Sequence, residues 1–183
     1  MKNSFIYIIL IFLNFQQIYA ENLNIKSSNI SVDKNTKITI FKDSVEATDS
    51  KNNIFKTDLA EYNKESKTLS SKGETVLITS EGFILKGENI LFDNSKKVIQ
   101  SNFPAIITDK ESNQIFLQRF EYSTEKNFFR STGNIKIIDT NKNQYNFSQL
   151  YIDEKKREII GTDIKSFLND SDFKINEKNK PRV

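Results

Sequence analysis

The chain has 183 residues, of which 37% are hydrophobic and 28% are charged, a composition typical of one soluble globular domain and not of a disordered chain. Its formal net charge of +3 is too small and too evenly spread for a nucleic-acid-binding protein. The absence of His and Cys excludes Cys-His and Ser-His-Asp nucleophiles, thiolate and imidazole metal sites, and disulfides.

Few other groups remain for catalysis or for cofactor binding. The sequence contains neither a GxGxxG nor a GxxxxGK[ST] motif, so it shows no nucleotide cradle. The carboxylates are scattered over polar positions, and the adjacent acids Asp153 and Glu154 fit a solvated turn better than an acid/base pair. We therefore predict that the protein is not an enzyme and that it binds no cofactor and no metal.

Residues 1–20 predict export. Lys2 precedes the apolar run "FIYIILIFL" (Phe5 to Leu13), and the small residue Ala20 stands before Glu21, which is the pattern of a secretory signal peptide cleaved after residue 20. An uncleaved membrane anchor is the alternative, but the apolar run is about half as long as a membrane-spanning helix. Without Cys, the exported chain must gain its stability from a hydrophobic core.

From about residue 30 onward the sequence repeats every thirty residues without a gap. Large apolar residues recur at this spacing, and in the later repeats a second apolar residue stands two positions earlier. An apolar residue at every second position is typical of a strand with one buried face. The two series are Val32, Tyr62, Phe92, Tyr122 and Ile152, and then Ala60, Ile90, Phe120 and Leu150.

A polar turn follows each of these segments, and a second strand, a second turn and a third strand come after it. Clusters such as "DNSKK" supply the first turn, and clusters such as "DTNKNQ" supply the second. A fixed period without helical spacing predicts an all-β domain of stacked antiparallel strands over residues 21–169. The further columns are Ala47, Leu77, Ile107, Ile137 and Phe167, and then Phe55, Leu85, Ile115 and Tyr145.

The periodicity leaves the use of the inward face open. The inward side chains can close on each other as a packed core, or two sheets can diverge and leave an apolar groove between them. If a groove exists, its lining is predicted to consist of Tyr62, Leu77, Ile90, Phe92, Ile107, Phe120, Tyr122, Ile137, Leu150 and Ile152.

The two ends of the predicted stack differ. The first repeat contains "TKITIF" (Thr36 to Phe41), which has no Pro and nothing else to block pairing at its edge. We predict that another β-stack docks at this edge by strand addition, on residues Ile38, Thr39, Ile40 and Phe41. At the other end, residues 170–183 become polar and lose the period, which predicts a linker or tail.

Two segments carry a resemblance to a known family. The repeat "LAEYNKESKTLSSKGETVLITSEG" (Leu59 to Gly82) and the later "RSTGNIKIID" (Arg130 to Asp139) resemble the OstA-like periplasmic domain of lipopolysaccharide-transport proteins. The tail is similar to the segment that joins this domain to an outer-membrane barrel in lipopolysaccharide-assembly proteins, with matches at Asn179, Pro181 and Arg182. The resemblance implies an open β-jelly-roll, or β-taco.

The resemblance also implies a function and partners. The domain would shield the acyl chains of lipopolysaccharide in its groove and pass them to the outer-membrane assembly site, in the periplasm or at the periplasmic face of the outer membrane of a Gram-negative bacterium. Its partners would be homologous β-jelly-roll proteins docked end to end and an outer-membrane barrel, which these 183 residues do not include. The alternative is a structural or adhesive β-solenoid with a fully packed interior.

Overall fold

A computed structural model describes residues 23–169, and this part of the chain is all-β. Sixteen strands form one sheet, every pairing is antiparallel, and no helix occurs among the described residues, so none of their segments is a helix that could span a membrane. The predicted all-β class is confirmed. The predicted signal peptide and the tail with Asn179, Pro181 and Arg182 lie outside the described residues.

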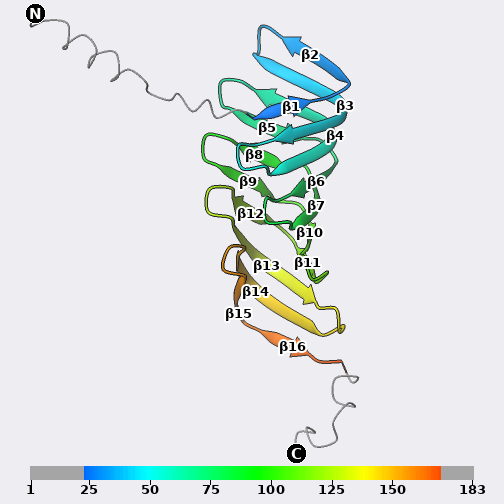
Figure 1. Ribbon diagram of the computed structural model, residues 1–183, viewed down its shortest axis with the longest axis vertical. Coiled ribbons are helices and arrows are strands. Elements are labelled where there is room, and N and C mark those ends of the chain that lie inside the picture. The colour runs from blue at the N-terminus through cyan, green and yellow to red at the C-terminus, as the bar shows by residue number, and fades with distance from the viewer. Residues whose placement is uncertain (1–22, 170–183) are drawn as a thin grey trace, which may run out of the picture.

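The strands stack along the long axis of the molecule, with β1 and β2 at one end and β16 at the other (Figure 1). Four of them are long: β3 (Ile38–Thr48), β4 (Ile54–Asn63), β13 (Phe128–Ile138) and β14 (Gln144–Asp153). The others are β1 (Asn24–Lys26), β2 (Asn29–Asp33), β5 (Thr68–Ser71), β6 (Glu74–Ile78), β7 (Ile84–Glu88), β8 (Leu91–Asp93), β9 (Val98–Ser101), β10 (Ala105–Thr108), β11 (Gln114–Leu117), β12 (Phe120–Ser123), β15 (Glu158–Thr162) and β16 (Lys165–Phe167).

The sheet is folded along its length into two facing halves. Half-sheet A consists of β2, β5, β8, β9, β12 and β15, and half-sheet B of β1, β6, β7, β10, β11 and β16, while each long strand contributes one part to each half. The chain passes between the halves at one side, which we call the bend, through short links such as 72–73 and 102–104. Register shifts in β3 and β13 fall on the same line, where Gly133 has a positive φ.

Repeated turns close the hairpins on the other side, which we call the turn edge. In half-sheet A, the residue that begins each turn recurs every thirty positions, and its side-chain oxygen accepts the backbone N–H of a residue two or three positions later. These residues are Asp33, Asn63, Asp93, Ser123 and Asp153. In half-sheet B, Asp109 accepts both the backbone and the side-chain N–H of Asn113 at 2.8 Å, and Asp49 and Asp139 do the same. Such Asx turns are the physical reason for the polar clusters at constant spacing.

The inward side chains of both halves form one hydrophobic core. Burial along a column depends on its place in the stack: Val32 is 61% exposed, whereas Phe92 and Tyr122 at the same repeat position are 2% and 0% exposed. Small residues such as Thr75, Ala105 and Ser131 stand next to the bend, where the two halves converge. The repeat therefore specifies the same inward direction everywhere, but only the middle of the stack is covered on both sides.

The last repeat departs from the predicted column. Phe167 stands thirty residues after Ile137, yet it pairs with Gln144, and Ser166 pairs with Tyr145, which packs against the core. Because a shift of one residue moves every side chain to the other face of a strand, Phe167 lies on the outer face. The period alone could not predict this shift, which follows from a shorter link between β15 and β16 than the link 102–104 of an inner repeat.

Candidate functional site

The ten residues predicted to line a groove all belong to the interior. Nine of them are buried in the hydrophobic core, and Tyr62 is partly buried against it. Leu77, Ile90 and Ile107 are completely covered, and the ring of Tyr122 stacks on that of Phe129 at 4.3 Å between centroids. The structure thus brings the predicted columns together, closed against each other, and their lipid-binding role stays a prediction.

The two halves are joined differently at their two sides. At the bend they are continuous chain, whereas at the turn edge they are held by contacts between turns. Lys51 Nζ donates to the carbonyl oxygen of Glu125 at 2.6 Å, and Asn127 Nδ2 donates to Ser80 Oγ at 3.3 Å. If the interior opens for a ligand, the two halves must separate at the turn edge, because separation at the bend would require the links themselves to rearrange.

The most buried of these contacts is centred on Glu154, which is 3% exposed. Its Oε1 accepts a hydrogen bond of 3.0 Å from the Thr79 hydroxyl of half-sheet B, and its Oε2 accepts one of 2.9 Å from the Tyr122 hydroxyl of half-sheet A. We call Glu154, Thr79 and Tyr122 the clasp. It joins turn 79–83 to turn 154–157, so it ties the middle of one half-sheet to the end of the other.

Burial raises the pKa of Glu154 to about 7, and the charge of Glu81 acts in the same direction. The hydrogen bonds from Tyr122 and Thr79 and the positive charge of Lys110 oppose this rise. Burial and the adjacent Glu154 carboxylate also raise the pKa of the Tyr122 hydroxyl. The clasp therefore contains a carboxyl group that changes its charge near neutral pH.

The prediction of a solvated turn at Asp153 and Glu154 is correct for Asp153 and wrong for Glu154. Asp153 accepts the Lys156 N–H as the first residue of a repeated turn. Glu154 is buried because turn 79–83 packs over it. The repeat contains a signal for this burial. The position of Glu154 in the repeat is an exposed lysine in the first two turns, Lys34 and Lys64, and a buried residue without a positive charge in the later ones, Asn94, Thr124 and Glu154.

The partner turn also departs from the repeat. The other half-sheet B turns begin with Asp and end with Asn, whereas this turn has Thr79 and Phe83 at those positions. Thr79 Oγ1 accepts the Phe83 N–H at 3.1 Å while its hydroxyl hydrogen is donated to Glu154. The Phe83 ring lies 6.5 Å from that of Phe129 across the interior. Both substitutions in the turn are explained by contacts with half-sheet A.

Beside the clasp, a cavity of about 260 Å³ opens at the turn edge. Phe83 of half-sheet B and Ile152 and Ile159 of half-sheet A are the apolar residues of its lining, together with charged side chains that include Lys110 and Arg157. Ile152 belongs to the core and Ile159 is half exposed. The cavity is therefore a place where the apolar interior reaches the surface between the two rows of turns.

The predicted docking edge at Ile38, Thr39, Ile40 and Phe41 is corrected by the structure. These residues lie in β3, which pairs with β2 on one side and with β4 on the other, so their backbone groups are not at the edge of the sheet. The edge strand of half-sheet A is β2, whose residues are all exposed. The preceding segment, Asn29–Asp33, carries Val32 of the first predicted column and is itself the edge strand, so the predicted edge was placed one strand too far into the sheet.

At both ends the interior face of the stack is uncovered. Ile30 and Val32 pair with Phe41 and Thr39, so they share the inward face of half-sheet A, and both are exposed. At the other end, β15 and β16 form the edges. Ile164 and Leu168 lie two residues before and after Ser166, which faces inward, and both are exposed. Free strand edges and exposed interior residues thus occur together at each end.

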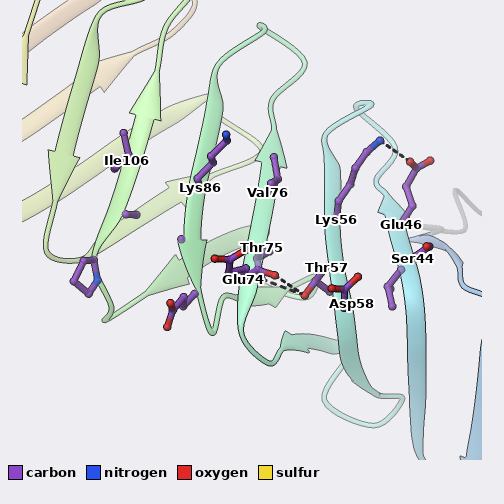
Figure 2. A pocket seen from close by; sticks show the side chains of 15 residues that line it. Ser44, Glu46, Lys56, Thr57, Asp58, Glu74, Thr75, Val76, Lys86 and Ile106 are labelled. Atoms are coloured by element: carbon purple, nitrogen blue, oxygen red, sulfur yellow. Dashed lines mark hydrogen bonds and ion pairs between the residues drawn. The ribbon is translucent and has the colours of Figure 1, made fainter.

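A larger cavity, of about 830 Å³, lies elsewhere. Figure 2 shows it as a trough across neighbouring strands of half-sheet B, with Glu46, Lys56, Val76, Lys86 and Ile106 pointing from successive strands. The carboxylates of Asp58, Glu74 and Glu88 stand nearer the bend. These residues alternate with buried ones, so the trough is on the outer face and is not the predicted groove.

Within residues 23–169 no group of three or more Asp or Glu is placed to hold a metal ion. No family model and no curated protein matches the chain. A similar solved structure is LptH, the LptA-homologous periplasmic component of the lipopolysaccharide transport device of Pseudomonas aeruginosa, with 10% identity over 81% of this chain and 96% of that chain and a TM-score of 0.33. A TM-score this low assigns no function to the chain.

Proposed function

We propose that this protein is a non-catalytic lipid carrier that shields the acyl chains of lipopolysaccharide between its two half-sheets and passes them to the next β-stack. The observation that carries the proposal is the apolar interior that continues, uncovered, to both ends of the stack. Ile30 and Val32 at one end are exposed, although their columns are buried in the middle, and Ile164 and Leu168 are exposed at the other end. The resemblance of the repeats to OstA-like domains supports the same function.

The interior is apolar enough to keep acyl chains from water at a favourable free energy. Each methylene group kept from water is worth about 0.8 kcal/mol, so an acyl chain that replaces contacts among Phe, Ile and Leu side chains retains most of that free energy. The anionic head group is too polar to enter and would stay outside. Entry of the chains therefore requires the turn edge to open while the bend holds the two half-sheets together.

Transfer from one molecule to the next is explained by the free edges. β2 runs toward turn 34–37 and β15 runs away from turn 154–157, so β2 of one β-stack can pair antiparallel with β15 of another. The same holds for β1 and β16 in half-sheet B. Such pairing would join the two interiors and would cover Ile30, Val32, Ile164 and Leu168.

The proposed place of action is the periplasm, between homologous β-jelly-roll proteins and an outer-membrane barrel. The export signal predicted over residues 1–20 and the tail resemblance around Pro181 support this location. A free-standing bridge protein and a domain of a longer barrel-containing protein are both compatible with the described fold.

The rival function is that of a structural or adhesive β-solenoid, and the packed interior favours it. A photo-crosslinker at Phe92 or Phe120, compared with one at Glu121 on the outer face, decides between the two. A lipid carrier should capture lipopolysaccharide at Phe92 and Phe120 and not at Glu121, in cells that transport the lipid. Absence of capture at both inward positions, in a folded protein, would reject lipid carriage in favour of the solenoid.

A further inference from the structure

The outer face of half-sheet B carries two adjacent rows of basic and apolar side chains. Cross-strand pairs place Lys86, Ile106, Phe116 and Lys136 next to one another on β7, β10, β11 and β13. The row continues through Asn146 to Lys165 on β14 and β16. Each of these positions alternates with inward residues, so the row faces away from the core.

The second row stands two residues nearer the turns, and half of its side chains are apolar. It contains Ile84, Ile138 and Phe167, separated by Thr108, Gln114 and Gln144. Ile84 is 39%, Ile106 is 37% and Phe167 is 57% exposed. We call the two rows from β7 to β16 the outer stripe. Strands are about 4.8 Å apart, so the stripe extends along the long axis of the molecule.

The lysines of the outer stripe are not held in ion pairs. Within residues 23–169 Lys86, Lys136 and Lys165 form no ion pair, and Lys136 Nζ lies 4.7 Å from the centre of the Phe116 ring. By contrast, Lys56 earlier in the same row pairs with Glu46 at 3.0 Å. Figure 2 shows this change along the row, from the Glu46–Lys56 pair to Lys86 beside Val76 and Ile106.

We propose that the outer stripe binds the surface of an anionic lipid bilayer. Lysines next to exposed aliphatic side chains suit such a surface, because the ammonium groups meet the phosphates while the apolar groups enter the headgroup region. A protein partner fits less well, since Lys is depleted from the cores of protein interfaces. A soluble polyanion would make no use of Ile84, Ile106 and Ile138. The stripe faces away from the interior, so the proposal is independent of lipid carriage.

The test is cosedimentation of the chain without its predicted signal peptide, residues 21–183, with vesicles of phosphatidylglycerol and phosphatidylcholine in equal parts, and with vesicles of phosphatidylcholine alone. K86E/K136E should weaken binding to the anionic vesicles by at least about tenfold. K34E/K64E changes the net charge equally, on exposed turns of half-sheet A, and should leave binding within about twofold of the unchanged protein. I84S/I106S should weaken the binding that persists at high salt.

Three outcomes would overturn the proposal: binding unaffected by K86E/K136E, an equal loss in K34E/K64E, or equally strong binding to phosphatidylcholine alone. Soluble inorganic polyphosphate is the probe for a polyanion site. If it binds the protein as tightly as the anionic vesicles do, and I84S/I106S changes neither affinity, the stripe is a polyanion site and not a membrane-binding surface. Circular dichroism of each variant confirms that the fold is kept.

Discussion

The Tyr122 hydroxyl donates a hydrogen bond of 2.9 Å to Glu154 Oε2, and the other carboxylate oxygen of Glu154 accepts the Thr79 hydroxyl from the opposite half-sheet. Glu154 occupies the same position of the repeat as Lys34 and Lys64, which are exposed, but it lies under a neighbouring turn. The consequence is a buried acid in a contact that an opening of the turn edge would break.

The clasp predicts how stability depends on pH. The pKa of Glu154 is raised from 4.5 to about 7 in the folded protein, so the folded state binds more protons than the unfolded state between these values. The contribution of Glu154 to the free energy of unfolding should therefore be complete below pH 4.5 and be lost, by about 3 kcal/mol in total, as the pH rises through about 7. At higher pH this contribution should stay constant.

Urea denaturation between pH 4.5 and pH 8 measures this effect. Glu154→Gln should remove the decrease, and at pH 8 the variant should be at least as stable as the unchanged protein. Glu158→Gln, an exposed acid in the adjacent strand β15, is the control and should keep the decrease. A decrease of equal size in Glu154→Gln would show that another group is responsible.

The place of a residue in the stack predicts the cost of truncating it. Phe92→Ala should lower the free energy of unfolding by about 3–5 kcal/mol, since it removes a buried ring. Val32→Ala, at the same position of the first repeat but 61% exposed, should cost less than about 0.5 kcal/mol. Equal costs, measured by urea denaturation of dilute protein, would mean that the first repeat is covered in solution.

A disulfide across the turn edge should block lipid uptake. The chain has no Cys, so Ser80→Cys with Asn127→Cys, whose side chains are in contact at 3.3 Å, introduces the only cysteine pair. Oxidation should prevent capture of lipopolysaccharide by a crosslinker at Phe120, and reduction should restore it. Ser80→Cys alone is the control. Undiminished capture in the oxidised double variant would show that lipid does not enter at this edge.

The fold could be predicted from the sequence because each repeat specifies its strands and turns by local residue patterns. Alternating apolar residues specify strands, and an Asx turn at Asp93 or Asp109 specifies where each hairpin closes. The column of Glu154 signals that this position is buried, but its partner could not be predicted, because the contact between Thr79 and Glu154 depends on how the two half-sheets cross. The same is true of the shift that turns Phe167 outward.

The ends of the stack supply the last prediction, which concerns docking. Because β3 is paired on both sides, a Pro at Thr39 would disturb the fold and would not test the edge, whereas residues of β2 can be changed without loss of core contacts. Ile30→Lys with Val32→Lys places two charges on the exposed inward face of β2, where they would be buried if β15 of another β-stack paired there. Burial of unpaired charges is costly, so head-to-tail association should be weakened by at least about tenfold.

Ser31→Lys, between Ile30 and Val32 on the outer face of the same strand, is the control and should leave association nearly unchanged. Sedimentation velocity over a range of protein concentrations measures both variants, and association that persists in Ile30→Lys with Val32→Lys would show that β2 is not the docking edge.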